Sequence, residues 1–111
     1  MELSKKDKKL AREIIEKGLN LEFERALSRS EQVLKEWRAQ ALANHEAYQK
    51  LYRHIKDYDK RIAQLYDGLR PAAYLEVIAV QYRDGFITDE DIAGLSEEAR
   101  KVLQRWAAVF E

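Results

Sequence analysis

Cysteine is absent from the 111 residues, and the helix-breaking residues are scarce, with four glycines and one proline. The lack of cysteine excludes disulfides, thiolate chemistry and cysteine-ligated metals, and it fits a reducing compartment. No apolar run approaches membrane-spanning length, and the first residues lack the apolar core of a signal peptide. We therefore expect a cytoplasmic location and no membrane partner.

Net charge is also missing, because twenty basic residues balance twenty acidic ones. This balance provides no global attraction to nucleic acid or to anionic membranes. Apolar residues make up 46% of the chain and charged residues 36%, a composition that folds rather than stays disordered. The length predicts a single helical domain over 1–111.

The few glycines and the single proline predict where helices begin and end. Ser4 is a candidate N-cap for a first helix that Gly18 ends, and Asn20 is a candidate N-cap for the next. Neither glycine nor proline occurs again until Gly68. The predicted helices lie at about 5–17, 20–67, 71–84, 89–93 and 96–110. The fold class is therefore all-α, a helical bundle built around one long helix over about 20–68.

A seven-residue repeat of mostly apolar side chains supports the long helix. One register holds Leu27, Leu34, Ala41, Tyr48, Ile55, Ile62 and Leu69, and the other holds Phe23, Ser30, Trp37, Asn44, Leu51, Tyr58 and Leu65. About six such repeats are typical of a coiled-coil helix. Tyrosines beside these positions widen the apolar stripe, so the helix is expected to have more than one neighbour.

The length of this helix leads to a prediction about assembly. About 48 residues at 1.5 Å per residue extend for about 70 Å, which the remaining helices are too short to cover. Either the helix breaks into a hairpin near Asn44, or a second chain completes the core. The repeat keeps its phase through the midpoint, which favours a continuous helix and a homodimer with paired Asn44 residues at the two-fold axis. The predicted interface residues are Trp37, Ala41, Asn44, Tyr48, Tyr52 and Tyr58.

No pattern in the sequence predicts catalysis or a cofactor. The chain has neither a phosphate-binding glycine loop nor a local nucleophile motif. His45 and His54 are nine residues apart, which places them on nearly opposite sides of one helix, so they cannot share a metal ion there. The segment from Asp84 to Asp91 matches part of a calcium-binding loop, but Val80 and Tyr82 would occupy its first and third ligand positions.

The predicted function is therefore that of a non-enzymatic protein–protein interaction or regulatory module, acting as a homodimer. One alternative is a nucleic-acid-associated regulator that uses a basic cluster consisting of Lys5, Lys6, Lys8, Lys9 and Arg12. Asp7 and Glu13 interrupt this cluster, which disfavours nucleic acid as a partner. Another alternative is a small-molecule or metal-binding bundle that uses His45, His54 and buried tyrosines.

Overall fold

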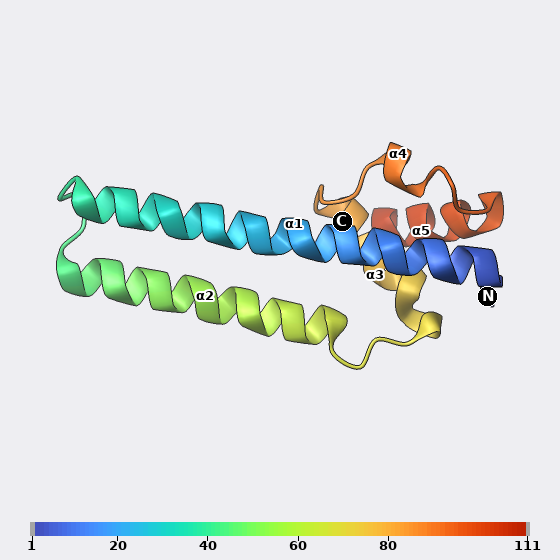
Figure 1. The fold of residues 1–111 in the computed structure, drawn as a ribbon, viewed down its shortest axis with the longest axis horizontal. Helices are drawn as coiled ribbons and strands as arrows, with labels where there is room; N and C mark the ends of the chain where they lie inside the picture. The colour runs from blue at the N-terminus through green and yellow to red at the C-terminus, as the bar shows by residue number, and fades with distance from the viewer. Residues whose placement is uncertain (1, 111) are drawn as a thin grey trace. The chain divides into compact units, whose positions relative to one another are not determined.

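The computed structural model describes residues 2–110, and within this range every regular element is helical (Figure 1), which confirms the all-α prediction. The elements are α1 Lys5–Arg38, α2 Asn44–Tyr66, the 3₁₀ helix η1 Pro71–Ala73, α3 Tyr74–Arg83, α4 Asp89–Ile92 and α5 Glu97–Val109. They form two compact units. We call residues 1–21 with 68–111 the terminal unit, and residues 22–67 the hairpin unit. Helix α1 contributes residues to both.

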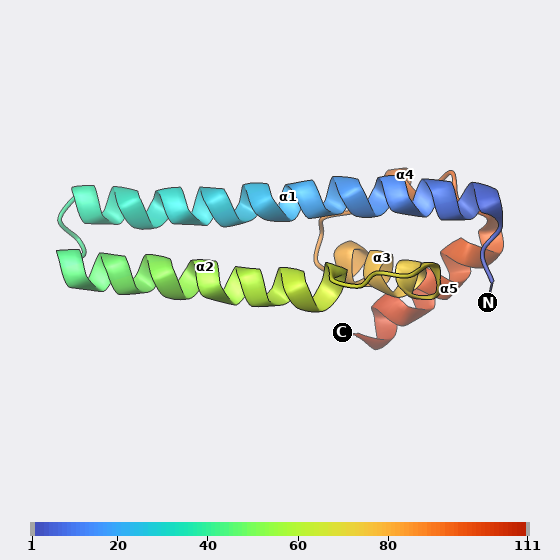
Figure 2. The same ribbon diagram turned by 60° about the horizontal axis from the view of Figure 1, so that its bottom comes forward.

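The helix boundaries in the first two thirds of the chain differ from the prediction. Helix α1 continues through Gly18 and Asn20, where a break was predicted, and the chain instead leaves the helix at residues 39–43. The predicted continuous helix over 20–67 is therefore wrong, and the alternative of a hairpin near Asn44 is the one that forms (Figure 2). The seven-residue repeat did not report where the helix ends, and the buried apolar residues Ala26, Val33 and Ala47 lie outside both of its registers.

The end of α1 explains why the break was missed, because it uses a glycine-type turn without a glycine. Gln40 has a φ of 62°, in the left-handed region. Its N–H donates to the Trp37 carbonyl at 2.9 Å, and the Ala41 N–H donates to the Glu36 carbonyl at 2.9 Å. This pair of hydrogen bonds is the Schellman motif, in which glycine usually occupies the left-handed position. Glutamine there gives no sequence signal.

We expect the Gln40→Gly substitution to raise the free energy of unfolding by about 1 kcal/mol, because a left-handed backbone is costly for residues that have a Cβ atom. Ala39→Gly is the matched control. Ala39 does not have a positive φ, so glycine there adds only unfolded-state entropy and should lower stability. Urea unfolding followed by circular dichroism measures both changes. Equal effects of the two substitutions would contradict this account of the turn.

The terminal unit has a well-formed apolar core. Helices α3 and α5 pack against each other, and the first turns of α1 add side chains from the other end of the sequence. The buried apolar residues of this unit are Leu3, Ala11, Ile14, Ile15, Tyr74, Leu75, Val77, Ile78, Ala79, Phe86, Ile87, Ile92, Leu95, Ala99, Leu103 and Ala107. Every element of the unit except η1 therefore contributes to one core.

Glycine and short polar side chains fix the helix ends of the terminal unit. Gly85, with a φ of 82°, ends α3, and the Phe86 N–H donates to the Gln81 carbonyl at 2.9 Å. The buried Asp7 carboxylate accepts from the Ser96 N–H at 3.0 Å and from its hydroxyl at 2.7 Å. The Ser96 hydroxyl in turn accepts from the Ala99 N–H at 3.2 Å. A side chain of α1 thus fixes the N-terminus of α5.

Asp91 connects the capping of α4 to α1. Thr88 and Asp91 form a reciprocal capping box, and the Lys17 ammonium group pairs with the Asp91 carboxylate. The hydrogen bond from Lys17, followed by those from Thr88, lowers the pKa of Asp91 below its ordinary value. A carboxyl group whose pKa is lowered by folding stabilises the protein above its unfolded-state pKa, and this contribution is lost as the pH falls through the folded-state value.

We expect Asp91→Asn to lower the free energy of unfolding by about 1 kcal/mol near neutral pH, because it weakens the capping box and removes the ion pair. The difference from the unsubstituted chain should shrink below about pH 4, where Asp91 of the unfolded chain becomes protonated, and it should disappear below the lowered folded-state pKa. Glu90→Gln, at an exposed neighbouring position, is the control and should have little effect. Urea unfolding across this pH range tests the prediction, and a difference that does not depend on pH would refute it.

Candidate interaction surface in the hairpin unit

The hairpin unit consists of two antiparallel helices with few fully buried apolar side chains. In residues 22–67, all of which are described, the buried apolar side chains are those of Ala26 and Val33 in α1 and Ala47 in α2. Half-buried Leu51 and His54 lie at the same contact, where the His54 Nε2 atom is 3.0 Å from the Ala26 carbonyl oxygen. Two small alanines and one valine make a minimal core for helices of this length.

Six of the fourteen large apolar side chains of the hairpin unit are instead exposed, and seven are half-buried. We call the six exposed side chains the apolar face: Phe23 (47% exposed), Leu27 (67%), Leu34 (43%), Tyr48 (74%), Tyr52 (61%) and Ile55 (45%). The spacings of three, four and seven residues align them along one side of each helix. Single exposed apolar residues are ordinary on protein surfaces, but aligned groups of this size are not.

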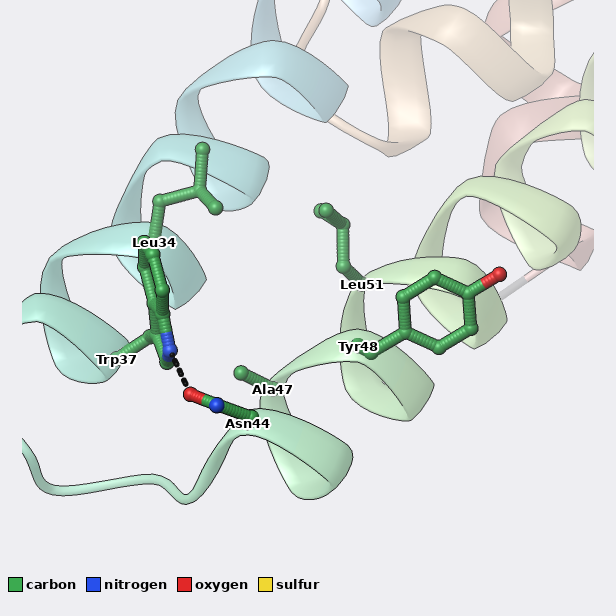
Figure 3. Close-up of a pocket in the computed structure, with 6 residues that line it drawn as sticks. All are labelled: Leu34, Trp37, Asn44, Ala47, Tyr48 and Leu51. Carbon is green, nitrogen blue, oxygen red and sulfur yellow. Dashed lines mark hydrogen bonds between the residues drawn. The ribbon is translucent and has the colours of Figure 1, made fainter.

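The two halves of the apolar face lie on the same side of the hairpin. Leu34 and Trp37 of α1 line one cavity together with Ala47, Tyr48 and Leu51 of α2 (Figure 3). The cavity has a volume of about 220 Å³ and opens beside the turn. The Trp37 indole N–H closes its end by donating to the Asn44 side-chain oxygen at 2.7 Å. Exposed residues of both helices therefore border a shared apolar hollow.

The opposite side of the hairpin is charged. Glu36 and Lys50 each follow a residue of the apolar face by two positions, which places them on the other side of their helices. The Lys50 Nζ atom lies 3.1 Å from the Glu36 carboxylate, so this ion pair joins the two helices there. Arg25, Arg29 and Asp57 likewise follow Phe23, Leu27 and Ile55 by two positions. The hairpin unit is thus amphipathic as a whole.

A buried carboxylate joins the two helices away from the turn. The Glu22 side chain is fully buried, and its carboxylate accepts from the Arg61 Nε–H at 2.5 Å and from the Tyr66 hydroxyl. Arg61 is more accessible, with 32% of its side chain exposed. The charged pair with its added hydroxyl satisfies an anion that would otherwise be very unfavourable in this position.

The predicted interface residues fall into different places in this structure. Trp37, Asn44 and Tyr48 line the cavity, and Tyr52 belongs to the apolar face. The remaining two are Ala41, which lies in the turn, and half-buried Tyr58, whose ring packs edge-on against His54 with centroids 5.0 Å apart. Asn44 begins α2 and does not lie at the middle of one helix, so helix length no longer predicts a homodimer.

Four residues of the apolar face were not predicted as interface residues, namely Phe23, Leu27, Leu34 and Ile55. All four stand at the repeat positions of the sequence, where a long helix would bury them. Their exposure follows from the hairpin, because each helix then has one neighbour instead of several. No sequence signal identifies their exposure, because it depends on the turn at Gln40, which contains no glycine.

His45, His54 and the basic cluster, on which the alternative functions rely, are not members of the apolar face. His45 is exposed, and His54 is half-buried against α1. Among the described residues, no group of three His, Cys, Asp or Glu side chains is arranged to hold a metal ion. The basic cluster lies in the first two turns of α1, where Lys8 is half-buried and its other members are exposed. None of the helices described between residues 2 and 110 combines the length and apolar character needed to cross a membrane.

Comparisons with protein-family models, with curated proteins and with solved structures found no match to this chain.

Proposed function

We propose that this chain is a non-enzymatic helical interaction module, whose apolar face binds an amphipathic α-helical surface of a protein. The observation that carries the proposal is the aligned exposure of six large apolar side chains in a unit whose fully buried apolar residues are two alanines and a valine. Apolar surface of this kind gains free energy when a partner removes it from water. Helical partners dock on such surfaces through apolar residues spaced three, four and seven positions apart.

The residue types and the shape of the surface support the same proposal. Tyr48 and Tyr52 are among its most exposed members, and aromatic side chains are enriched in the buried centres of protein interfaces. The cavity beside Trp37 is apolar and large enough to receive a bulky side chain, which is how strong interface contacts are usually built. The proposal includes a cytoplasmic location, because a chain without cysteine needs no oxidising compartment to fold.

A photo-crosslinking amino acid placed at Tyr48 tests this function in the cell that makes the protein. Irradiation should give a covalent protein adduct at this position, and mass spectrometry of the adduct identifies the partner and the linked residue. The control places the same amino acid at exposed Gln49, which lies one position on and 100° around α2. The proposal requires an adduct that forms at Tyr48 and is much weaker at Gln49. Absence of any adduct at Tyr48, or equal adducts at both sites, would contradict it.

A further inference from the structure

We infer that the partner of the apolar face is the same face of a second copy of this chain, so that two hairpin units form a four-helix bundle with two-fold symmetry. This inference rests on the proposed function, because it names the occupant of the same surface. Three properties of the hairpin unit select a second copy: the angle between its buried and exposed sides, the area of the apolar face and the balance of its charges.

The angle comes from a one-residue offset that recurs throughout the unit. Every member of the apolar face directly follows a residue that is buried or half-buried: Phe23 follows Glu22, Leu27 follows Ala26, Leu34 follows Val33, Tyr48 follows Ala47, Tyr52 follows Leu51 and Ile55 follows His54. One residue turns an α-helix by about 100°. On both helices, the exposed stripe is therefore about 100° away from the side that faces the other helix.

This angle indicates how many further helices would complete a bundle with α1 and α2. In a bundle of three helices the two neighbours of any helix lie about 60° apart, whereas in a square of four they lie about 90° apart. An offset of about 100° on both helices therefore fits the square. The missing part is a pair of helices, one opposite α1 and one opposite α2, and a second hairpin unit supplies such a pair with matching length.

The area of the apolar face is sufficient for a specific dimer. If a fully exposed side chain of this size presents about 200 Å², the exposed fractions of the six residues amount to roughly 700 Å² per chain. Two faces in contact would bury about 1,400 Å², which lies within the usual range of stable protein–protein interfaces. The largest apolar patch of an ordinary monomer is about 300–600 Å².

Charge does not oppose association of two copies. Residues 22–67 contain nine Lys and Arg residues against eight Asp and Glu residues, a net charge of +1. Two hairpin units therefore repel each other only weakly. The unit also has no large excess of either charge that would favour an oppositely charged partner. A two-fold axis places the same patch on both sides of the interface, which suits a surface that is apolar along both of its helices.

Sedimentation equilibrium of the purified full chain tests this inference. We expect a mass of twice 13.1 kDa at micromolar concentrations. Leu27→Glu should weaken the dimer roughly 100-fold, because it places a charge in the apolar interface. Ser28→Glu is the matched control, since Ser28 is exposed one position further along α1, and its dimer should persist. A monomer at high micromolar concentration, or a dimer equally affected by the two substitutions, would overturn the inference.

A second measurement remains informative if Leu27→Glu fails to fold. Because the chain has no cysteine, single cysteines at Tyr52 and Gln49 can be alkylated without interference. The thiol of Tyr52→Cys should react slowly in the dimer and quickly after dilution, whereas that of Gln49→Cys should react quickly throughout. Equal rates at both sites, or protection at Tyr52→Cys that survives dilution to monomer, would rule out a second copy on this face.

The two proposals fail in different ways. If the purified chain is monomeric while the crosslinker at Tyr48 joins it to a different protein, the second-copy inference is wrong and the proposed function stands. If the crosslinker gives no adduct of any kind, the proposed function fails and the inference fails with it. An adduct with a mass of two chains, together with a dimer sensitive to Leu27→Glu, supports both.

Discussion

Replacing Arg61 with methionine is expected to lower the free energy of unfolding of the hairpin unit by about 3 kcal/mol. The Glu22 carboxylate is fully buried, and the Arg61 Nε–H is its charged partner at 2.5 Å. Methionine keeps most of the side-chain volume but removes the charge, which leaves a buried anion with the Tyr66 hydroxyl as its remaining donor from this group. Breaking a buried ion pair from one side costs more than the pair itself contributes.

Arg53→Met is the control, because Arg53 is exposed on the same helix and the substitution is chemically identical. It should change the free energy of unfolding by less than about 0.5 kcal/mol. Urea unfolding can be followed through Trp37 in a Trp106→Phe background, so that fluorescence reports the hairpin unit alone. The experiment should be done at fixed protein concentration, since dimer formation would contribute to the measured stability. Equal effects of the two substitutions would show that Glu22 does not depend on Arg61.

The pairing of Glu22 with Arg61 also shows what the sequence left undetermined. The residues are 39 positions apart, and no local pattern connects them until the position of the turn is known. With α1 ending at Arg38 and α2 beginning at Asn44, residues equally distant from the turn face each other, and the contact follows. One missed turn therefore removed every long-range contact of the hairpin unit from the prediction.

The C-terminal third was predictable because its helix ends use residues with strong local preferences. Thr88 and Ser96 cap α4 and α5 through their hydroxyl groups, and Gly85 takes the left-handed position that ends α3. These are short-range effects, in which the side chain or the missing Cβ acts within four residues. Local chemistry of this kind can be deduced from a single sequence.

Glycine misled the prediction twice in α1, for opposite reasons. At the end of the helix, Gln40 takes the conformation that glycine usually provides. Within the helix, Gly18 gives room to the side chain of Gln81, 63 positions later in the chain. A glycine that is needed for close approach cannot be distinguished in one sequence from a glycine that ends a helix. The candidate surface was partly predictable, because the repeat identified its side of each helix but not its exposure.

The contact at Gly18 leads to the second large effect, in which Gly18→Ala is expected to destabilise the terminal unit by about 2 kcal/mol. A Cβ atom at this position would lie 2.6 Å from the Gln81 side-chain amide carbon, well inside contact distance. Gln81 is fully buried, and its Nε2–H donates to the Ile15 carbonyl at 3.0 Å. The amide would have to move, which lengthens that hydrogen bond and leaves a buried polar group poorly satisfied.

Two opposing terms determine the sign of this effect. Alanine is favoured over glycine inside a helix by about 1 kcal/mol, whereas overpacking and the lost hydrogen bond together cost about 3 kcal/mol. Gly94→Ala is a suitable control, since a Cβ there would meet the Leu10 side chain at an ordinary 3.5 Å. Thermal unfolding of both variants should show a clear drop for Gly18→Ala alone.

A double-mutant cycle with Gln81→Ala identifies the cause of that drop. Gln81→Ala should itself be destabilising, because it empties a fully buried site. In its presence Gly18→Ala meets no amide, so the alanine should be neutral or stabilising through its helix propensity alone. The coupling free energy between the two substitutions should therefore be about 2 kcal/mol or more. Additive effects would mean that Gly18 is kept for a reason other than the approach of Gln81.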